Sequence, residues 1–232
     1  MSEATLADAL SFYLEYLLDI GETELYIGSR TVNVEGKENK PPSKAELLSI
    51  LAEEIRDCTK CKLHSTRTNV VVGAGNPDAK VMFVGEAPGE EEDRQGIPFV
   101  GRAGRLLTSA LEEVGWSRDD VYIANVLKCR PPKNRPPLPN EMSACLPYLI
   151  RQIDIIQPEV IVALGRVAGQ AFMKKSISIS RFRGKFANFR GRRVFFMYHP
   201  SYLLRNPSAM REFNTDFRGL WERYGEERNK GR

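Results

Sequence analysis

The sequence has no long hydrophobic run. No stretch of about 18 consecutive apolar residues occurs, so we expect no membrane span and no membrane partner. The first eight residues contain two acidic and no basic side chains, and Glu15 and Asp19 interrupt the apolar stretch that follows, which argues against a secretory signal. We therefore expect a cytoplasmic protein.

Two common phosphate and metal motifs are also missing. The glycines near residue 85 are not followed by Gly-Lys-Ser/Thr, so a P-loop is excluded. The segment "LTSALEEVGW" (107–116) ends like the glutamate box of nucleotide pyrophosphohydrolases, but Thr108 and Ser109 replace the Arg-Glu pair that this box needs. We therefore interpret Glu112 and Glu113 as a solvated helix face.

The composition is that of an ordinary globular protein with an uneven charge. Of 232 residues, 42% are hydrophobic and 28% charged, enough for one substantial core with an appendage. The net charge of +4 combines −4 over residues 1–45, −2 over residues 46–173 and +10 over residues 174–232. A segment as basic as the last one is typical of a polyanion-binding surface, and an ordinary solvated surface explains it equally well.

The N-terminal part differs in character from the rest. Apolar residues at helical spacing predict a helix over 5–20, and "TVNVEGKENKPPS" (31–43) is typical of a linker. We expect residues 1–45 to form a helical appendage and linker, 46–228 the main domain and 229–232 a disordered tail. The appendage either docks on the main domain, which we favour, or binds a protein partner.

Strands and helices alternate along the main domain. Ser43 and Glu46 form a capping box that predicts the start of a helix. Strands are expected at 80–85, 121–127, 160–165 and 193–198, and helices near 103–114, 140–156, 166–174 and 208–224. This order predicts an α/β fold with a central four-stranded, mostly parallel sheet covered by helices on both faces. Ligands of such sheets bind beyond the carboxyl ends of the strands, where "GEAPG" (85–89), Asn125 and "HPS" (199–201) would meet.

The chain has only four cysteines, and they favour a metal site. Cys58 and Cys61 form C-x2-C, and fifteen residues separate Cys129 from Cys145. Disulfides are disfavoured in the cytoplasm, and four thiolates suit either zinc or an iron–sulfur cluster. The absence of a second short knuckle favours the cluster slightly.

Two further stretches suggest a pocket for a planar group. Gly85, Pro88 and Gly89 allow a sharp turn, and Phe99 either stacks on a ligand or belongs to the core. In "HPSYLLR" (199–205), His199 is one of two histidines, and the apolar residues between arginines are what a protein needs to wedge into a duplex. The alternative is that these residues begin a core helix.

Taken together, the motifs resemble one family. From Cys58 to Arg205 the chain resembles the family 4 uracil-DNA glycosylases, on "GEAPGEEEDRQGIPFVGRAG", "NVLKCRPPKNR", the four cysteines and "HPSYLLR". The resemblance implies a three-layer α/β/α domain with a [4Fe-4S] cluster on Cys58, Cys61, Cys129 and Cys145. It also implies a base excision repair enzyme that flips uracil out of single- or double-stranded DNA and hydrolyses its N-glycosidic bond. We expect a monomer; a non-catalytic, metal- or cluster-stapled nucleic-acid-binding module is the alternative.

The resemblance also assigns residues. Ala87, Phe99, Asn125 and His199 would bind uracil, with His199 donating to uracil O2 as the base leaves. Ser201, Tyr202, Leu203, Leu204 and Arg205 would contact DNA. In family 1 relatives an aspartate stands where this chain has Ala87, so a different group must position the attacking water. Glu86 is our first candidate and Glu92 the second, and a water held by the backbone is the alternative.

Overall fold

The computed structural model describes residues 24–27, 30–33 and 41–224. The chain divides into two units, Met1–Pro42 and Ser43–Arg232. In the first, β1 (Glu24–Ile27) and β2 (Arg30–Asn33) pair as an antiparallel hairpin, so residues 31–33 belong to a strand and not to the expected linker. The helix expected over 5–20 and the tail expected over 229–232 lie outside the described residues.

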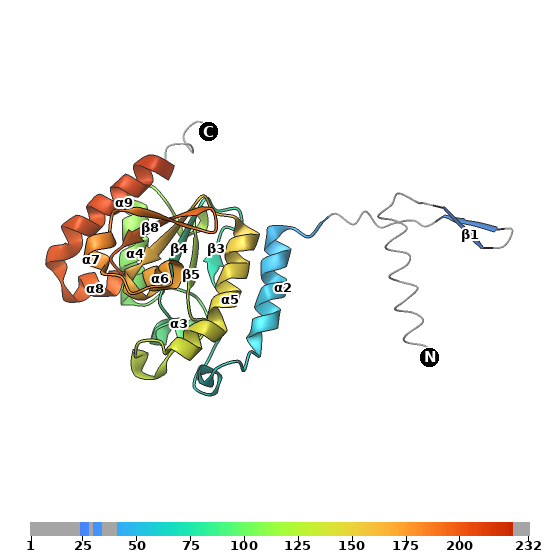
Figure 1. Cartoon of the computed structure of the whole chain (residues 1–232), viewed down its shortest axis with the longest axis horizontal. Helices are drawn as coiled ribbons and strands as arrows, with labels where there is room; N and C mark the ends of the chain where they lie inside the picture. The colour runs from blue at the N-terminus through green and yellow to red at the C-terminus, as the bar shows by residue number, and fades with distance from the viewer. Residues whose placement is uncertain (1–23, 28–29, 34–40, 225–232) are drawn as a thin grey trace. The chain divides into compact units, whose positions relative to one another are not determined.

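The second unit contains a six-stranded sheet (Figure 1), two strands more than expected. Its centre consists of β5 (Tyr122–Asn125), β4 (Val81–Gly85), β6 (Val160–Leu164) and β8 (Arg192–Met197), which are parallel and match the four predicted strands. Two antiparallel edge strands extend it, β3 (Ala74–Gly75) beside β5 and β7 (Phe186–Phe189) beside β8. The complete order is β3-β5-β4-β6-β8-β7.

The two edge strands escaped prediction for physical reasons. A two-residue strand is too short to show an alternating pattern, and β7 is mostly exposed. β7 joins β8 through Arg190 and Gly191, whose φ values of 50° and 82° place both residues in the left-handed region. Such a two-residue turn is typical of a tight hairpin, but Arg-Gly is a weak signal for it.

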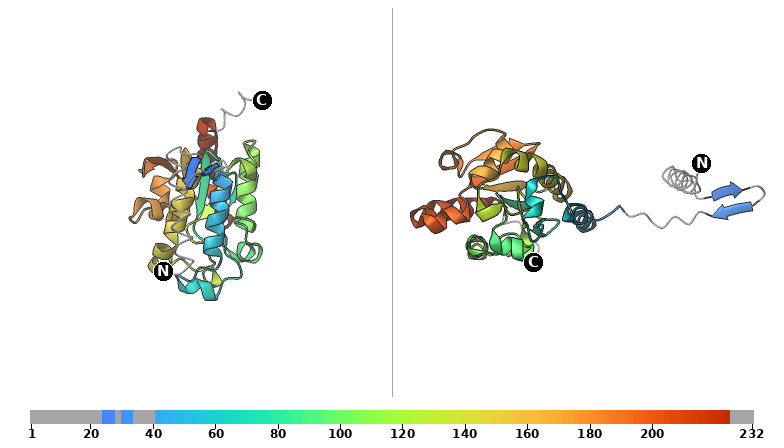
Figure 2. Two further views of the ribbon diagram at one scale, coloured as in Figure 1. Left: turned by 90° about the vertical axis from the view of Figure 1, so that its right-hand side faces the viewer. Right: turned by 90° about the horizontal axis from the view of Figure 1, so that it is seen from below.

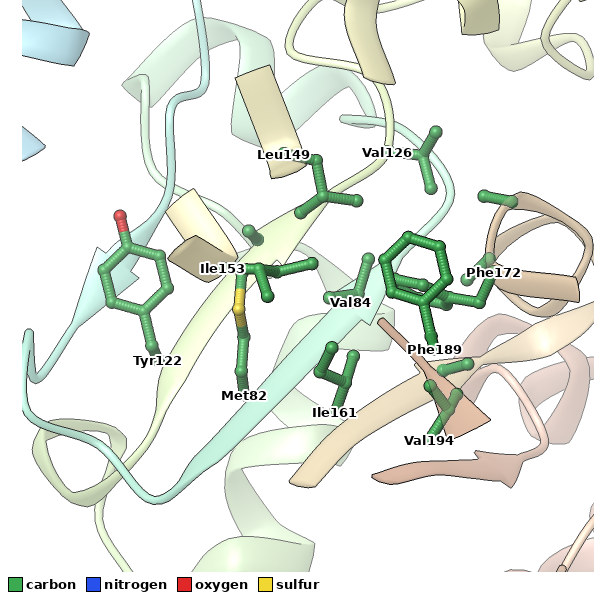
Figure 3. Packing of buried hydrophobic residues seen from close by; sticks show 14 of the residues in the cluster. Met82, Val84, Tyr122, Val126, Leu149, Ile153, Ile161, Phe172, Phe189 and Val194 are labelled. Carbon is green, nitrogen blue, oxygen red and sulfur yellow. The ribbon is translucent and has the colours of Figure 1, made fainter. Parts of the chain in front are cut away.

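Helices cover both faces of the sheet (Figures 1 and 2). On one face α2 (Lys44–Arg56), α5 (Pro139–Ile156), α6 (Gly165–Met173) and α7 (Ile179–Phe182) pack over one apolar cluster, part of which Figure 3 shows. On the other face lie α4 (Arg102–Glu113), α8 (Pro200–Arg205) and α9 (Met210–Tyr224). Among the described residues one further helix is α3 (Glu90–Gln95), and short 3-10 turns span Lys62–Ser65, Arg118–Asp120, Pro132–Asn134 and Pro207–Ala209.

Local signals set several of these boundaries. Ser43 caps α2 as predicted, since its hydroxyl accepts from the Glu46 amide and the Glu46 carboxylate accepts from the Ser43 amide at 2.7 Å. Glu112 and Glu113 are exposed on α4, as the solvated-face interpretation requires. No described helix combines the length and apolar character needed to cross a membrane.

Candidate active site

A cavity of about 920 Å³ opens where the parallel strands end. The segment 86–92 after β4, Asn125 at the end of β5, Gly165 and Arg166 after β6, and residues 198–205 after β8 contribute to its lining. The expectation that the "GEAPG" turn, Asn125 and "HPS" converge at one edge is therefore confirmed. Phe99, which lies before α4, also lines the cavity.

Phe99, Asn125 and His199 face the same space. The ring centroids of Phe99 and His199 are 5.6 Å apart at 33°. Gly85 lies below them, because a Cβ at this position would come within 2.4 Å of Asn125 Oδ1 and 2.5 Å of the Phe99 ring. A glycine is therefore required at the end of β4 for the ring and the amide to approach the backbone this closely.

Asn125 carries a polar atom that lacks a partner. Its residue is 2% exposed, and within the described residues its Oδ1 is the buried side-chain polar atom without a hydrogen bond. Buried acceptors are normally satisfied, so this oxygen points to a missing donor. The main chain of Asn125 is fixed, since Lys128 Nζ donates to its carbonyl at 2.9 Å and to Gln152 Oε1 at 2.5 Å.

His199 is held as a neutral imidazole. Its Nδ1 accepts from the Ser201 amide at 3.1 Å and lies 2.8 Å from the Ser201 hydroxyl. Because the amide can only donate, Nδ1 carries no proton and Nε2 carries one. Burial, with the charge of Arg205 second, lowers the pKa of His199 to about 4. The side chain is therefore a neutral N–H donor at physiological pH.

Glu92 is occupied by backbone amides. Its Oε1 accepts from Val100 at 2.9 Å and Gly101 at 2.8 Å, and its Oε2 accepts from Gly89 at 3.1 Å. The carboxylate thereby joins the "GEAPG" turn to the turn that carries Phe99. Both of its oxygens are used within the protein.

The neighbouring acidic residues of α3 anchor the loop. Glu91 pairs with Arg94 at 2.5 Å, and Glu90 with Arg130 at 3.5 Å. Asp93 accepts from the backbone amides of residues 68 and 69 at 2.9–3.3 Å. Acidic residues in the first turn also stabilise α3, because their negative charge lies at the positive end of the helix dipole.

Glu86 differs from these carboxylates. Within the part of the chain that the structure describes, no hydrogen bond reaches its carboxylate, which lines the cavity. Burial raises its pKa, and the nearby charge of Arg166 partly offsets this effect. The main-chain carbonyl of Glu86 accepts from the Leu127 amide at 3.0 Å, which holds the backbone from which the side chain projects.

The helix α8 presents only part of "HPSYLLR" to the cavity. Ser201, Tyr202, Leu204 and Arg205 line it, and Leu204 is 39% exposed. Leu203 is 1% exposed and packs in the core beneath the sheet. The expectation that Leu203 contacts DNA is therefore wrong, because the helical turn directs adjacent side chains to different sides; the apolar tip is Leu204.

Sequence reasoning missed two arginines of this cavity. Arg166 follows the third predicted strand and Arg102 begins α4, and both line the cavity with Arg205. Arg166 follows directly from the edge rule that identified the other segments, since it lies beyond the carboxyl end of β6. Arg102 offered no comparable signal.

The four cysteines lie around a second, smaller cavity. Cys58 and Cys61 follow α2, Cys129 follows β5 and Cys145 lies on α5. All four thiols are free. Across the described residues, no three His, Cys, Asp or Glu side chains converge as a single metal ion requires. Four thiols around a common cavity fit a larger group better than one ion.

Nearby donors stabilise charge on these sulfurs. Arg67 Nη1 lies 3.4 Å from Cys129 Sγ, and the Lys128 amide lies 3.2 Å from Cys145 Sγ. Burial raises the pKa of Cys145 to about 11, and Lys128 opposes this shift. A thiolate-bound group would therefore displace protons and gain two ready-made hydrogen bonds.

Comparisons with known proteins agree with this geometry. Residues 72–223 match the model of the uracil DNA glycosylase superfamily. The chain is 55% identical over 168 residues to a type-4 uracil-DNA glycosylase of Thermotoga maritima, covering 72% of this chain and 88% of that protein. It is 47% identical over 188 residues to a type-4 enzyme of Archaeoglobus fulgidus, covering 78% and 94%. A type-5 uracil-DNA glycosylase of Pyrobaculum aerophilum is 36% identical over 153 residues, covering 59% and 67%. The chain therefore belongs to the uracil DNA glycosylase superfamily and, within it, groups with the type-4 enzymes.

Proposed function

We propose that this protein is a uracil-DNA glycosylase of base excision repair, which hydrolyses the N-glycosidic bond of deoxyuridine in DNA and leaves an abasic site. The observation that carries the proposal is the unpartnered Oδ1 of Asn125, buried beside the Phe99 ring and the His199 imidazole in one cavity. These three groups complement one face and the polar edge of an extrahelical uracil. The type-4 relatives support the same reaction.

The substrate must first leave the base stack. Flipping a nucleotide costs a few kcal/mol. Leu204, exposed on α8, is placed to occupy the space that the base vacates, while Arg102, Arg166 and Arg205 around the cavity bind phosphates. These contacts offset the cost of flipping.

Asn125 then selects the base. Its Oδ1 accepts the uracil N3–H, and its Nδ2 donates to O4. Cytosine presents an acceptor at N3 and a donor at C4, so the same amide meets it with mismatched groups. Because the amide is buried, such a mismatch leaves polar groups unsatisfied and is strongly disfavoured. The Phe99 ring stacks on the flat face of the accepted base, and Ala87 lines the cavity beside it.

His199 stabilises the leaving base. As the glycosidic bond breaks, its electron pair moves into the base and negative charge accumulates on O2. The neutral Nε2–H of His199 donates to this oxygen. Donors aimed at charge that develops in the transition state typically contribute about 3–4 kcal/mol.

Glu86 acts on the sugar side. Bond cleavage leaves a cation-like sugar, which a carboxylate stabilises, and the same carboxylate takes a proton from the attacking water. Glu86 has its oxygens available, whereas those of Glu92 are engaged by three amides. We therefore assign the chemical role to Glu86 and the shaping of the pocket to Glu92.

The four cysteines hold a [4Fe-4S] cluster in this proposal. The group supplies a rigid cross-link between the loop after α2 and the segment 129–145, and we assign it no redox change during turnover. Absorbance at about 400 nm distinguishes the two loadings, because protein with an iron cluster absorbs there and zinc-loaded protein does not. Iron and sulfide content per chain gives an independent measure.

The test of the activity is base release without divalent metal. The protein is incubated in EDTA with an oligonucleotide that contains one uracil, and abasic sites are cleaved with alkali. Cleavage at the uracil, but not in the matched cytosine oligonucleotide, is expected. The His199→Ala protein, purified in parallel, controls for a contaminating glycosylase. Binding without cleavage would identify a nucleic-acid-binding module, and a requirement for Mg²⁺ would contradict the mechanism.

A further inference from the structure

Phe99 adopts a backbone conformation that is unusual for a bulky residue. Its φ of 53° lies in the left-handed region, and the residue is only 5% exposed. Such conformations persist only where surrounding groups enforce them. The turn that carries the proposed stacking ring must therefore be held by specific contacts.

One side of this turn is held by Glu92 through its amides, as described above. The other side is held by Arg118, which lies nineteen residues further along the chain in the 3-10 turn Arg118–Asp120. Its Nη2 donates to the Pro98 carbonyl at 2.6 Å and its Nη1 to the Phe99 carbonyl at 2.9 Å. Nη1 also lies 3.4 Å from Thr108 Oγ1, which orients the guanidinium.

The two hydrogen bonds from the Arg118 guanidinium depend on the backbone conformation of Phe99. In an extended chain, successive carbonyls point to opposite sides, whereas in a helical conformation of either hand they point the same way. The positive φ of Phe99 takes the backbone out of the extended conformation, and the carbonyls of residues 98 and 99 both accept from the one Arg118 guanidinium. Arginine presents two N–H groups in a fixed fork, which a lysine cannot reproduce.

The close packing of α4 against the backbone of Phe99 also restricts this turn. A Cβ at Gly104, in the first turn of α4, would lie 2.0 Å from the Phe99 carbonyl oxygen. The helix therefore presses against the same peptide that Arg118 binds. Arg118 is half-buried, and the opposite charge of Glu92 acts on it across the turn.

We propose that Arg118 is a positioning residue for uracil binding, which fixes the Phe99 ring through the carbonyls of residues 98 and 99 without touching the substrate. This inference rests on the proposed stacking role of Phe99. Arg118 is not among the residues that line the cavity. Its loss leaves the pocket chemistry in place but releases the ring from its stacking position.

The test is a mutant cycle between Arg118 and Phe99. Single-turnover excision rates and the inhibition constant of free uracil are measured for Arg118→Ala, Phe99→Ala and the double variant. We expect Arg118→Ala to lower the rate by about 10- to 100-fold, because a displaced contact group typically costs that much, and to weaken inhibition by uracil. In the Phe99→Ala background the Arg118 change should have no further effect, since there is no ring left to position.

Three controls make the cycle decisive. Arg118→Lys, which keeps the charge but loses the fork, should give an intermediate rate. Arg151→Ala removes an arginine of the outer surface that pairs with Glu54, and it should keep the wild-type rate. Circular dichroism melting sets an assay temperature at which every variant is folded; if Arg118→Ala does not fold, Arg118→Lys and Arg118→Gln take its place in the cycle.

The possible failures are distinguishable. A wild-type rate in Phe99→Ala would refute the stacking role and this inference with it. A slow Phe99→Ala with a wild-type Arg118→Ala would refute only the inference. Additive losses in the double variant would show that Arg118 acts through general stability or on another group, and would also overturn it.

Discussion

Replacing His199 by alanine isolates the stabilisation of the departing base. The variant loses the Nε2–H donor that we place opposite uracil O2, while Asn125 and Phe99 still bind the base. A donor of this kind contributes about 3–4 kcal/mol to the transition state, so the excision rate should fall by about two to three orders of magnitude. Uracil affinity should change much less, because O2 carries little charge in the ground state.

The pH dependence of the same residue follows from its environment. The pKa of His199 is lowered from 6.5 to about 4, so the imidazole stays neutral down to mildly acidic pH. The rate should therefore show no ionisation of this histidine near pH 6.5. For stability the sign is fixed: His199 contributes fully above pH 6.5, and this contribution is lost as pH falls through the folded-state pKa near 4. The decline should be weaker in His199→Ala.

The assay is rapid-quench excision under single-turnover conditions, with circular dichroism and cluster absorbance as checks of folding. Ser201→Ala serves as a matched control. It removes the hydroxyl but keeps the backbone amide on Nδ1, so the tautomer survives and the rate should fall only about 2- to 10-fold. A near-normal rate in His199→Ala, or a His199 pKa near 6.5 in an NMR titration, would refute the assigned role.

Three further substitutions test the other assigned roles. Asn125→Asp should lower uracil excision and reduce the preference for uracil over cytosine by at least about tenfold, because a carboxylate accepts from the cytosine amino group; an unchanged ratio of the two rates would contradict the amide readout. Burial raises the pKa of Glu86, so the wild-type excision rate should decline as pH falls through that pKa. Glu86→Gln should be about 100-fold slower and should not show this decline at low pH. The same pH profile in the variant and the wild type would exclude Glu86 as the base. Leu204→Ala should slow excision from duplex DNA far more than from single strands, and equal losses on both substrates would exclude Leu204 as the wedge. As a control, Leu203→Ala should leave the strand preference intact and lower the free energy of unfolding by about 2–5 kcal/mol.

The central architecture was predictable because one physical rule governs it. Buried parallel strands must be continuous apolar runs, and 81–85 and 160–164 are buried at every position. The same rule locates the functional edge, since parallel strands end on one side. The two antiparallel edge strands obey no such rule, because a short or exposed strand needs little apolar surface. They had to be seen in the structure.

The roles of individual side chains were less predictable, because role depends on what each atom contacts. Glu86 and Glu92 have the same chemistry and lie six positions apart, Glu86 in the turn after β4 and Glu92 in α3. Only the structure shows that three amides engage Glu92 and that no hydrogen bond within the described residues engages the Glu86 carboxylate. Leu203 and Leu204 are identical residues side by side, but the helix directs the first side chain into the core and the second to the surface. Arg118 had no sequence signal at all, since its partners are main-chain carbonyls about twenty residues away.

Contacts connect the region around the four cysteines to the larger cavity, although the thiols do not line that cavity. Asp93 of α3 binds the backbone at residues 68 and 69, in the loop that follows Cys61, and Ala87 of the "GEAPG" turn packs against the apolar cluster around the cysteines. On the other side of the same short helix, Glu92 holds the Phe99 turn. In the proposed function, a group bound by the cysteines would therefore stabilise the two turns, on either side of α3, that carry Glu86 and Phe99. Under this proposal, a structural cluster would affect uracil excision through these contacts, without electron transfer and without contact to the base.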